Sequence, residues 1–461
     1  MNKGQGFGEF AEVSAKQWKQ KIQYDLKGAD YNEELVWESP EGIKVKPFYH
    51  REDLEGLRTL PPQAPRSWEI VEPVYGGDLE KAGARAHGLL KKGAEGLLFT
   101  LPEATMDPER LLAKVDLEAV PLYFDLQFLD PVPIAALVSR TADHKGGIHM
   151  ALDPIGQLVR SGNWYQDQGK DFGVLGEILA LPRPQGGTLV GIHMDHYQNA
   201  GAHAVQQLAY GLAHAHEYLH HFAGTVGAHA LKPCFKVAIG GNYFFEIAKL
   251  RALRWLWDSL SGAYSRKGDC QILAMPSRRN KTLYDYNVNL LRTNSECMSA
   301  VLGGADAICN LPYDALYHKE NAFGRRIARN QLLLLREEGH FNGASHVADG
   351  AYYIESLTEQ LAQRALELFK GIEASGGFLS ALKKGSVQQK IRESAAKEQD
   401  LFDRGELVLL GTNRFQNPGD RMKGELQLHP FVKKRGRKTL IEPIVARRLA
   451  EGSEQKRLED E

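Results

Sequence analysis

The chain has 461 residues, 43% of them hydrophobic and 25% charged, a composition typical of a globular protein with a large core. Its 57 lysines and arginines against 58 aspartates and glutamates leave a net charge of −1, which argues against binding to nucleic acid or an anionic membrane. No apolar run approaches the roughly 18 residues of a membrane span, and the N-terminus lacks an apolar leader, so we expect a cytoplasmic protein.

The four cysteines are widely spaced and form no C-x-x-C pair, so we expect reduced thiols in the core. Residues 1–65 are rich in aromatics, including Trp18 and Trp37, and end in the proline-rich "LPPQAPRSW". They contain too many aromatic residues for a disordered linker. We therefore predict an extended N-terminal arm that packs against another surface.

From residue 68 the chain alternates short apolar runs with helical patterns. Strands are predicted at 68–75, 96–101, 120–128, 146–153, 188–196, 235–241, 271–277 and 305–313. Eight strands, each followed by a helical stretch, predict an α/β fold, a (β/α)8 TIM barrel over residues 66–340. A doubly wound open sheet is the alternative, but no G-x-G-x-x-G turn follows the first strand.

Residues 341–461 are predicted to form a helical extension of the barrel. Leu357, Leu361, Ala365 and Leu368 mark one face of a helix there. The apolar run "ELVLLGTNRFQNP" is predicted to be a strand that leads into a turn. The charged tail "RLAEGSEQKRLEDE" is predicted to be solvated and frayed.

The segment "HEYLH" matches the H-E-x-x-H motif of zinc peptidases, with His216 and His220 one helical turn apart and Glu217 as the base. The extended motif fails, because residues 223 and 226 are alanine and valine. Glu246 could be nominated as a third ligand, but it lies on the far side of a predicted strand without the expected surroundings. His216 also lies on the apolar face of its helix, so we interpret the segment as an outer barrel helix without a metal.

The stretch "GIHMDHYQNAGA" places His193, Asp195 and His196 at the carboxyl end of the strand over 188–196, taken as the fourth of the barrel. Barrel enzymes keep their catalytic groups at this end. Along a strand, residues 193 and 195 would share one face and residue 196 the other, so one ion would not gather all three without a turn. We expect a hydrogen-bonding histidine rather than a metal. Tyr75, at the end of the first strand, is either a proton donor or stacking residue, or an aromatic plug over the barrel.

Several segments resemble the methylmalonyl-CoA mutase family in the same order along the chain. They are residues 18–49, 197–219, 242–257, 291–314, 325–339, 350–382 and 410–415. Residues 197–219 match the family's A-G-A-x-A-x-Q-E-L-A stretch, and "NYFFEIAKLRALRWLW" matches its F-F-x-E-I-A-K-x-R-A-x-R-x-L-W helix. The resemblance covers nearly the whole chain.

The resemblance implies an adenosylcobalamin-dependent isomerase that interconverts methylmalonyl-CoA and succinyl-CoA, with the pantetheine arm threaded down the barrel. The cofactor carries the radical chemistry, and the protein excludes water and orients the thioester. A catalytic subunit also carries a cobalamin domain with a D-x-H-x-x-G motif, whose histidine binds cobalt.

This sequence departs from that pattern in its chemistry. It contains no D-x-H-x-x-G, and it stops about where the linker to a cobalamin domain would begin. "ALDPIGQLVRSGNW" stands where the family's catalytic chain contacts the acyl carboxylate. Of the family's reacting groups, only the barrel histidine has a counterpart in this sequence, which is His196. The tyrosine that usually precedes that histidine is replaced by Asp195. The sequence around Tyr75 does not align clearly enough with the family's pattern to identify Tyr75 as the family's first-strand tyrosine.

Three hypotheses follow. The resemblance favours the small (β) subunit of a heterodimeric mutase of propionate metabolism, non-catalytic alone, with His196 vestigial. Adenosylcobalamin would then be bound mainly by the large subunit, and acyl-CoA only by the complex. The alternative is the active barrel half of a split acyl-CoA mutase, which receives cobalamin from a separate protein and uses His196 as an acid, with Arg160 or Ser161 near the substrate. The third is an unrelated zinc hydrolase that uses "HEYLH".

Overall fold

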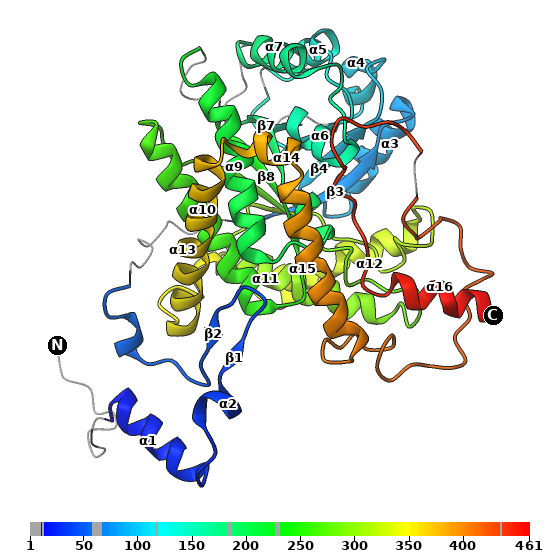
Figure 1. Ribbon diagram of the computed structural model, residues 1–461. Coiled ribbons are helices and arrows are strands. Elements are labelled where there is room, and N and C mark those ends of the chain that lie inside the picture. Colours follow the sequence, from blue (N-terminus) through cyan, green and yellow to red (C-terminus); the bar gives the residue numbers. More distant parts are fainter. Residues whose placement is uncertain are drawn as a thin grey trace, which may run out of the picture.

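The computed structural model describes residues 11, 13–57, 67–115, 119–142, 144–181, 186–225, 231–433 and 436–461. Eight parallel strands close into a barrel in the order β10-β3-β4-β5-β6-β7-β8-β9 (Figure 1). They are β3 (Glu69–Tyr75), β4 (Gly96–Leu101), β5 (Leu122–Leu126), β6 (Ile148–Leu152), β7 (Thr188–His193), β8 (Pro233–Ile239), β9 (Gln271–Pro276) and β10 (Ala307–Ile308). The predicted (β/α)8 TIM barrel is confirmed.

All eight predicted strands are present, because short apolar runs bounded by turns suit a parallel sheet that is buried on both faces. The strand before His193 is the fifth of the barrel, not the fourth, since β6 over Ile148–Leu152 is already the fourth. In β4, Leu97 and Phe99 face the shell between strands and helices, whereas Leu98 belongs to a separate cluster inside the barrel. This alternation divides the barrel's core into two layers.

Helices surround the barrel and follow its strands. They are α3 (Leu79–Leu90), α4 (Pro108–Leu112), α5 (Pro131–Arg140), α6 (Pro154–Ser161), α7 (Gln168–Leu179), α8 (Asp195–Asn199), α9 (Ala204–Phe222), α10 (Tyr243–Ala263), α11 (Val288–Leu302) and α12 (Ala322–Leu333). Each helix from α3 to α7 begins after an aspartate whose carboxylate accepts a backbone N–H of the first turn. This capping satisfies donors that would otherwise lack partners.

The first helices of the N-terminal segment project away from the barrel (Figure 1), whereas Ile43 further along it is fully buried in the main core. This segment contains α1 (Ala15–Asp25), α2 (Tyr31–Leu35), a short antiparallel pair formed by β1 (Trp37–Glu38) and β2 (Lys44–Val45), and a 3-10 turn over Arg51–Leu54. The proline-rich hinge lies mostly within residues 58–66, outside the described residues. The division at 65/66 and 340/341 therefore stays a prediction.

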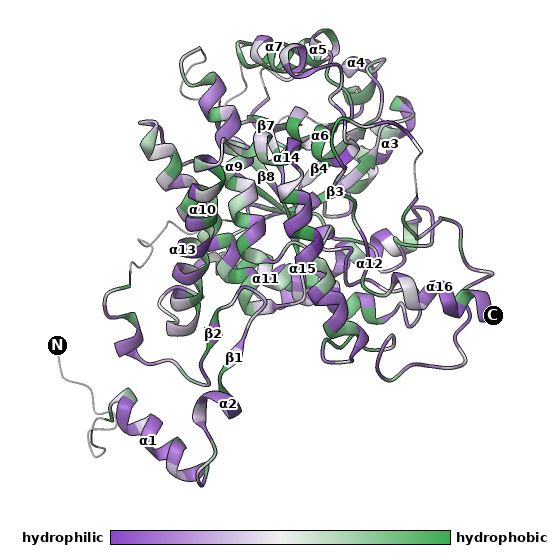
Figure 2. Cartoon of the chain, viewed as in Figure 1, coloured by the Kyte–Doolittle hydropathy of each residue, from purple (hydrophilic) through white to green (hydrophobic). Residues whose placement is uncertain are grey.

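The C-terminal extension is helical, as predicted, but it is broken into separate helices. They are α13 (Tyr352–Ala374), α14 (Phe378–Lys383), α15 (Ser386–Asp403) and α16 (Glu451–Asp460), after a π-helical turn over Leu334–Glu338 and a 3-10 turn over Ala344–His346. Helix α13 packs on α9 and α10 as a further layer. Figure 2 shows hydrophobic residues around the barrel and largely hydrophilic residues on α1 and α15.

Two predictions for this extension were wrong. The run at 406–418 forms one isolated bridge, Leu410 with Arg414, instead of a strand, because the closed barrel offers no edge to pair with. The charged tail is the ordered helix α16 rather than a frayed end. The carboxylate of Glu454, 2% exposed, accepts the Leu283 backbone N–H at 2.7 Å and pairs with Arg448 at 2.5 Å.

Residues 440–449, here named the C-terminal strap, cross the loops at the carboxyl end of the barrel. Backbone N–H groups of the strap donate to carbonyls of Val159 on α6, Asn199 on α8 and Arg279 after β9, at 2.8 to 3.0 Å. The strap thus joins three segments that follow barrel strands at the mouth of the barrel. None of the helices in the described ranges combines the length and apolar character needed to cross a bilayer.

Candidate functional site

The mouth of the barrel brings together His193, Asp195 and His196. Strand β7 ends at His193 and α8 begins at Asp195, so the chain turns within two residues. One ligand atom from each residue lies within 4.8 Å of the others, and the two imidazole rings are stacked with centroids 5.2 Å apart. The turn that the sequence argument named as the condition for gathering all three is present, because the strand ends at His193 instead of running through residue 196.

A partly buried ion pair that sequence reasoning missed lies beside these residues. Lys236 Nζ on β8 donates to Asp125 Oδ2 on β5 at 2.9 Å. Although burial raises the pKa of Asp125, Lys236 and His193 lower it to about 2, so the carboxylate is charged. A charged residue within an otherwise apolar strand, as in "LYFDLQF" and "FKVAIGG", was the available signal.

The charges at the mouth are nearly balanced without a metal. Burial alone would raise the pKa of Asp195, but Lys236 and the two histidines hold it well below its ordinary value. Burial lowers the pKa of His193, and Asp195, 3.6 Å away, outweighs it and raises that pKa. Two carboxylates therefore face one ammonium and a histidine that favours its charged form. The three donors could hold a cation, but the Lys236 ammonium opposes one electrostatically.

His196 is held in its neutral form. Burial, the largest cause, together with His193, Lys236 and Arg160 lowers its pKa to about 4 against the opposing effect of Asp195. A general acid must carry its proton at the working pH. His196 therefore lies at the mouth, but at neutral pH its imidazole does not carry the extra proton that a general acid would donate.

We expect this shift to make the protein less stable in acid. The unfolded chain binds a proton at His196 near pH 6.5, whereas the folded chain does so only near pH 4. The contribution of His196 to the free energy of unfolding is therefore complete above about pH 6.5 and declines as the pH falls from there to about 4. Urea unfolding of wild type and H196Q between pH 7 and pH 4.5 should show a shallower decline for H196Q. H87Q, at an exposed position of α3, is the control, and equal declines for wild type and H196Q would contradict the assignment.

Below the mouth, Asp153 ties three elements together. Its carboxylate caps α6 through the Gly156 N–H at 2.7 Å and accepts the His193 backbone N–H at 3.0 Å. It also pairs with His214 Nε2 at 2.7 Å and accepts the Tyr218 hydroxyl at 2.8 Å, both from α9. These contacts fix where β7 ends and thereby position the histidines above.

The bore of the barrel is filled. Its inward-facing cluster consists of Val71, Leu98, Tyr123, Cys234, Leu273, Ala307 and Cys309, each at most 4% exposed. Towards the amino end, the Tyr123 hydroxyl donates to Glu69 at 2.8 Å and accepts from Gln271 at 2.7 Å, and the Tyr123 ring stacks on His149 at 4.6 Å. Burial raises the pKa of Glu69 to about 7. Side chains therefore close the barrel axis at the level of Tyr123.

The "HEYLH" segment lies on α9, with its polar groups already engaged. His216 bonds Tyr264 through Nε2 at 2.7 Å and Glu373 through Nδ1 at 2.9 Å. Glu217 accepts the Leu379 backbone N–H at 2.9 Å, and His220 is exposed. In the described part of the chain, the group of donors placed for a metal is the one at the mouth.

The other candidates lie apart from the histidines or face solvent. Tyr75 is 60% exposed, which does not fit a plug over the barrel. Glu246 lies on α10 and pairs with Lys249 at 2.5 Å. Arg160 donates to Gln157, and the Ser161 hydroxyl donates to the Asn163 carbonyl at 2.7 Å, so both are held at the end of α6.

Comparisons with known proteins agree with the resemblance. The sequence pattern of the family described as methylmalonyl-CoA mutase matches residues 103–456. The methylmalonyl-CoA mutase small subunit of Porphyromonas gingivalis is 35% identical, over 89% of this chain and 71% of that one. The small subunit of Streptomyces virginiae is 29% identical over 88% and 71%, and the large subunit of the same organism is 30% identical over 89% and 63%.

The chain thus spans less than two thirds of the large subunit that it matches. A dihydropteroate synthase of Thermus thermophilus superimposes with a TM-score of 0.32 at 12% identity, over 59% of this chain and 94% of that one, which is too loose to bear on function. The family match extends over most of the chain and includes the barrel mouth. This chain belongs to the methylmalonyl-CoA mutase family.

Proposed function

We propose that this chain is a non-catalytic small subunit of an adenosylcobalamin-dependent methylmalonyl-CoA mutase. It would pair with a catalytic large subunit in a cytoplasmic heterodimer of propionate metabolism. The names of its relatives support a two-subunit enzyme, since Streptomyces virginiae has both a small and a large subunit. In this proposal the chain supports its partner and does not itself bind substrate.

The filled bore carries this proposal. In the family the pantetheine arm of the substrate threads along the barrel axis, so a catalytic barrel needs an open bore. Here Leu98, Tyr123 and Leu273 meet inside the barrel with exposed fractions of 4%, 1% and 3%. To admit a pantetheine arm, several of these large side chains would have to leave the packed interior. Burial of each one contributes about 2 kcal/mol to the stability of the fold.

The described residues do not fit a cobalamin site either. The 461 residues contain no D-x-H-x-x-G. At the mouth Lys236 and His193 already offset the carboxylates of Asp125 and Asp195, and the C-terminal strap crosses the surrounding loops. We therefore place adenosylcobalamin in the partner subunit and assign no chemical step to this chain.

The N-terminal arm supports a partner of this kind. Trp18 is 48% exposed, Tyr24 80% and Trp37 49%, and α1 buries none of its residues against the rest of the chain. Exposed aromatics on a projecting segment are the residue types that dominate protein interfaces. A large subunit that covers this arm would account for an aromatic content that the chain itself leaves in contact with solvent.

The proposal is tested with the isolated full-length chain. We expect no saturable binding of methylmalonyl-CoA in calorimetry up to about 1 mM, a concentration above most values of KM. We also expect no succinyl-CoA to form when adenosylcobalamin is added. The purified large subunit, run in parallel, is the positive control. Micromolar binding or cobalamin-dependent turnover by this chain alone would contradict the proposal.

A further inference from the structure

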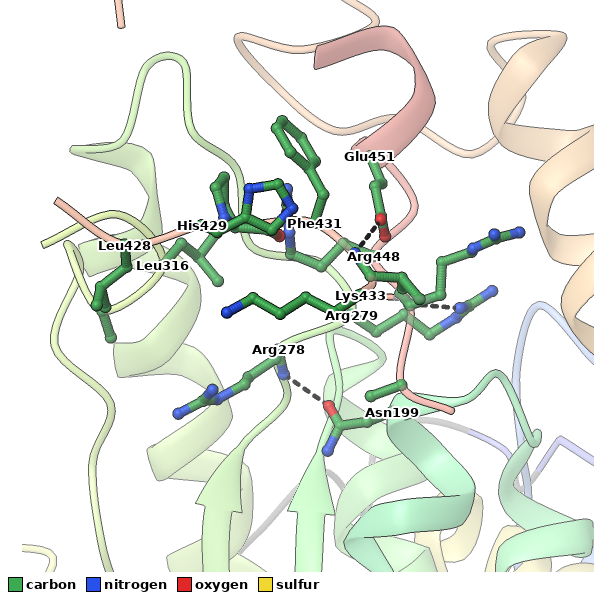
Figure 3. A pocket seen from close by; sticks show the side chains of 15 residues that line it. Asn199, Arg278, Arg279, Leu316, Leu428, His429, Phe431, Lys433, Arg448 and Glu451 are labelled. Atoms are coloured by element: carbon green, nitrogen blue, oxygen red, sulfur yellow. Dashed lines mark hydrogen bonds between the residues drawn. The ribbon is translucent and has the colours of Figure 1, made fainter. Parts of the chain in front are cut away.

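A cavity of about 320 Å³ lies between the carboxyl end of the barrel and the C-terminal extension. Arg278 and Arg279, which follow β9, form one side of it, and residues 428–433 and 446–448 form the other (Figure 3). The cavity is outside the filled bore and is not used by the proposed function.

The cavity is lined by an excess of positive charge. Arg278, Lys433 and Arg447 make no ion pair in the described part of the chain, whereas Arg279 pairs with Glu398 at 2.6 Å and Arg448 pairs with Glu454 at 2.5 Å. Three cations thus line one small cavity without a carboxylate partner. All three are exposed to solvent, and an anion bound among them would offset their mutual repulsion.

Two arginines of the lining have further electrostatic features. Arg278 is exposed to solvent, and desolvation of its guanidinium together with nearby Arg325 lowers its pKa despite the opposing effect of Asp195. Arg448 is 5% exposed and pairs with Glu454, and its buried Nε has no hydrogen-bond acceptor among the described residues. The guanidinium of Arg278 therefore lies among more positive than negative charge.

Lys433 and Arg278 lie at one end of the cavity and its carboxylate lies at the other. The Lys433 side chain runs across the opening and ends on the same side as the Arg278 guanidinium, next to Leu316 and Leu428 (Figure 3). Glu451, the one carboxylate of the lining, lies at the opposite end beside Phe431 and accepts the Val432 N–H at 2.6 Å. Glu451 therefore does not neutralise the Lys433 and Arg278 end.

We propose that this cavity binds a small organic phosphate, with its phosphate group held by Arg278, Lys433 and Arg447. Guanidinium groups match phosphate oxygens in bidentate geometry, and a doubly charged phosphate offsets three cations better than a single carboxylate does. The neighbouring leucines and Phe431 offer an apolar wall for the carbon part of the ligand. The proposal holds whether or not the chain has a catalytic partner.

The size of the cavity sets the class of ligand. About 320 Å³ is at the lower end of small-molecule sites, enough for one phosphate with a compact organic group. A nucleic-acid strand would need an extended basic groove.

Calorimetry on the full-length chain, with phenyl phosphate, inorganic phosphate and phenol as probes, tests the proposal. We expect phenyl phosphate to bind most tightly, inorganic phosphate more weakly, and phenol not at all. R278Q and K433Q should each weaken binding of phenyl phosphate by about tenfold or more, because each removes a charge-assisted contact. R51Q in the arm and K438Q, which is in the same basic run but outside the cavity, are the matched controls.

Three other results of these titrations would overturn the proposal. Absence of phenyl phosphate binding at millimolar concentration would do so, as would equal weakening by K438Q and K433Q, which would indicate unspecific attraction to the basic run. Tighter binding of benzoate than of phenyl phosphate would reassign the cavity to carboxylates. Circular dichroism and melting of each variant establish that lost binding is not lost folding.

Discussion

Replacing Asp153 by alanine should lower the free energy of unfolding by about 3–5 kcal/mol, the cost of removing one partner from a buried ion pair. The carboxylate is buried and accepts from Gly156, His193, His214 and Tyr218. All four donors would lose their acceptor at once, and His214 is fully buried. Urea unfolding monitored by circular dichroism measures the loss.

A matched substitution separates this network from ordinary helix capping. Asp167 also caps a helix, α7, through the Lys170 N–H at 2.9 Å, but it is exposed to solvent. D167A should therefore cost far less than D153A. A loss below about 1 kcal/mol for D153A, no larger than an average substitution, would show that the Asp153 network does not hold the mouth together.

Replacing Lys281 by methionine should be about as costly, near 3–5 kcal/mol. Lys281 Nζ lies 2.8 Å from both carboxylate oxygens of Glu296, and each side chain is 1% exposed. Burial shifts the pKa of Lys281 down and that of Glu296 up, so desolvation opposes the charged form of both. Removing the ammonium leaves a carboxylate in the core between the end of β9 and α11.

The double variant K281M/E296L is the control for this second prediction. It removes both charges and keeps similar volumes, so most of the stability lost in K281M should return. Unfolding of the single and double variants is compared in the same urea series. If the double variant is as unstable as K281M, the loss arises from packing rather than from an unpaired charge.

The barrel could be predicted because its evidence is local. Each strand is an apolar run bounded by turns, and β4 was predicted at 96–101, where it lies. The run at 406–418 has the same local composition, but a strand also needs a neighbour, and the barrel has closed before this run begins. Likewise the charged tail gave no local sign that Glu454 would reach the Leu283 backbone across the fold.

The site was less predictable because it depends on contacts between distant segments. His196 was placed at the mouth correctly, but where β7 ends depends on Asp153, 40 residues before His193. The pairing of Asp125 with Lys236 joins residues 111 positions apart. The closure of the bore depends on inward residues from several strands, none of which is unusual in its own sequence.

The measurement that tests the central claim most directly is the turnover of the reconstituted complex with H196A in this chain. The chain is mixed with the catalytic large subunit, complex formation is verified by size-exclusion chromatography, and succinyl-CoA formation is followed. Under the proposed non-catalytic role of this chain, kcat with H196A should stay within about twofold of wild type. Loss of a general acid typically costs about 10²–10⁴-fold, so a fall of about a hundredfold in an intact complex would contradict the non-catalytic assignment.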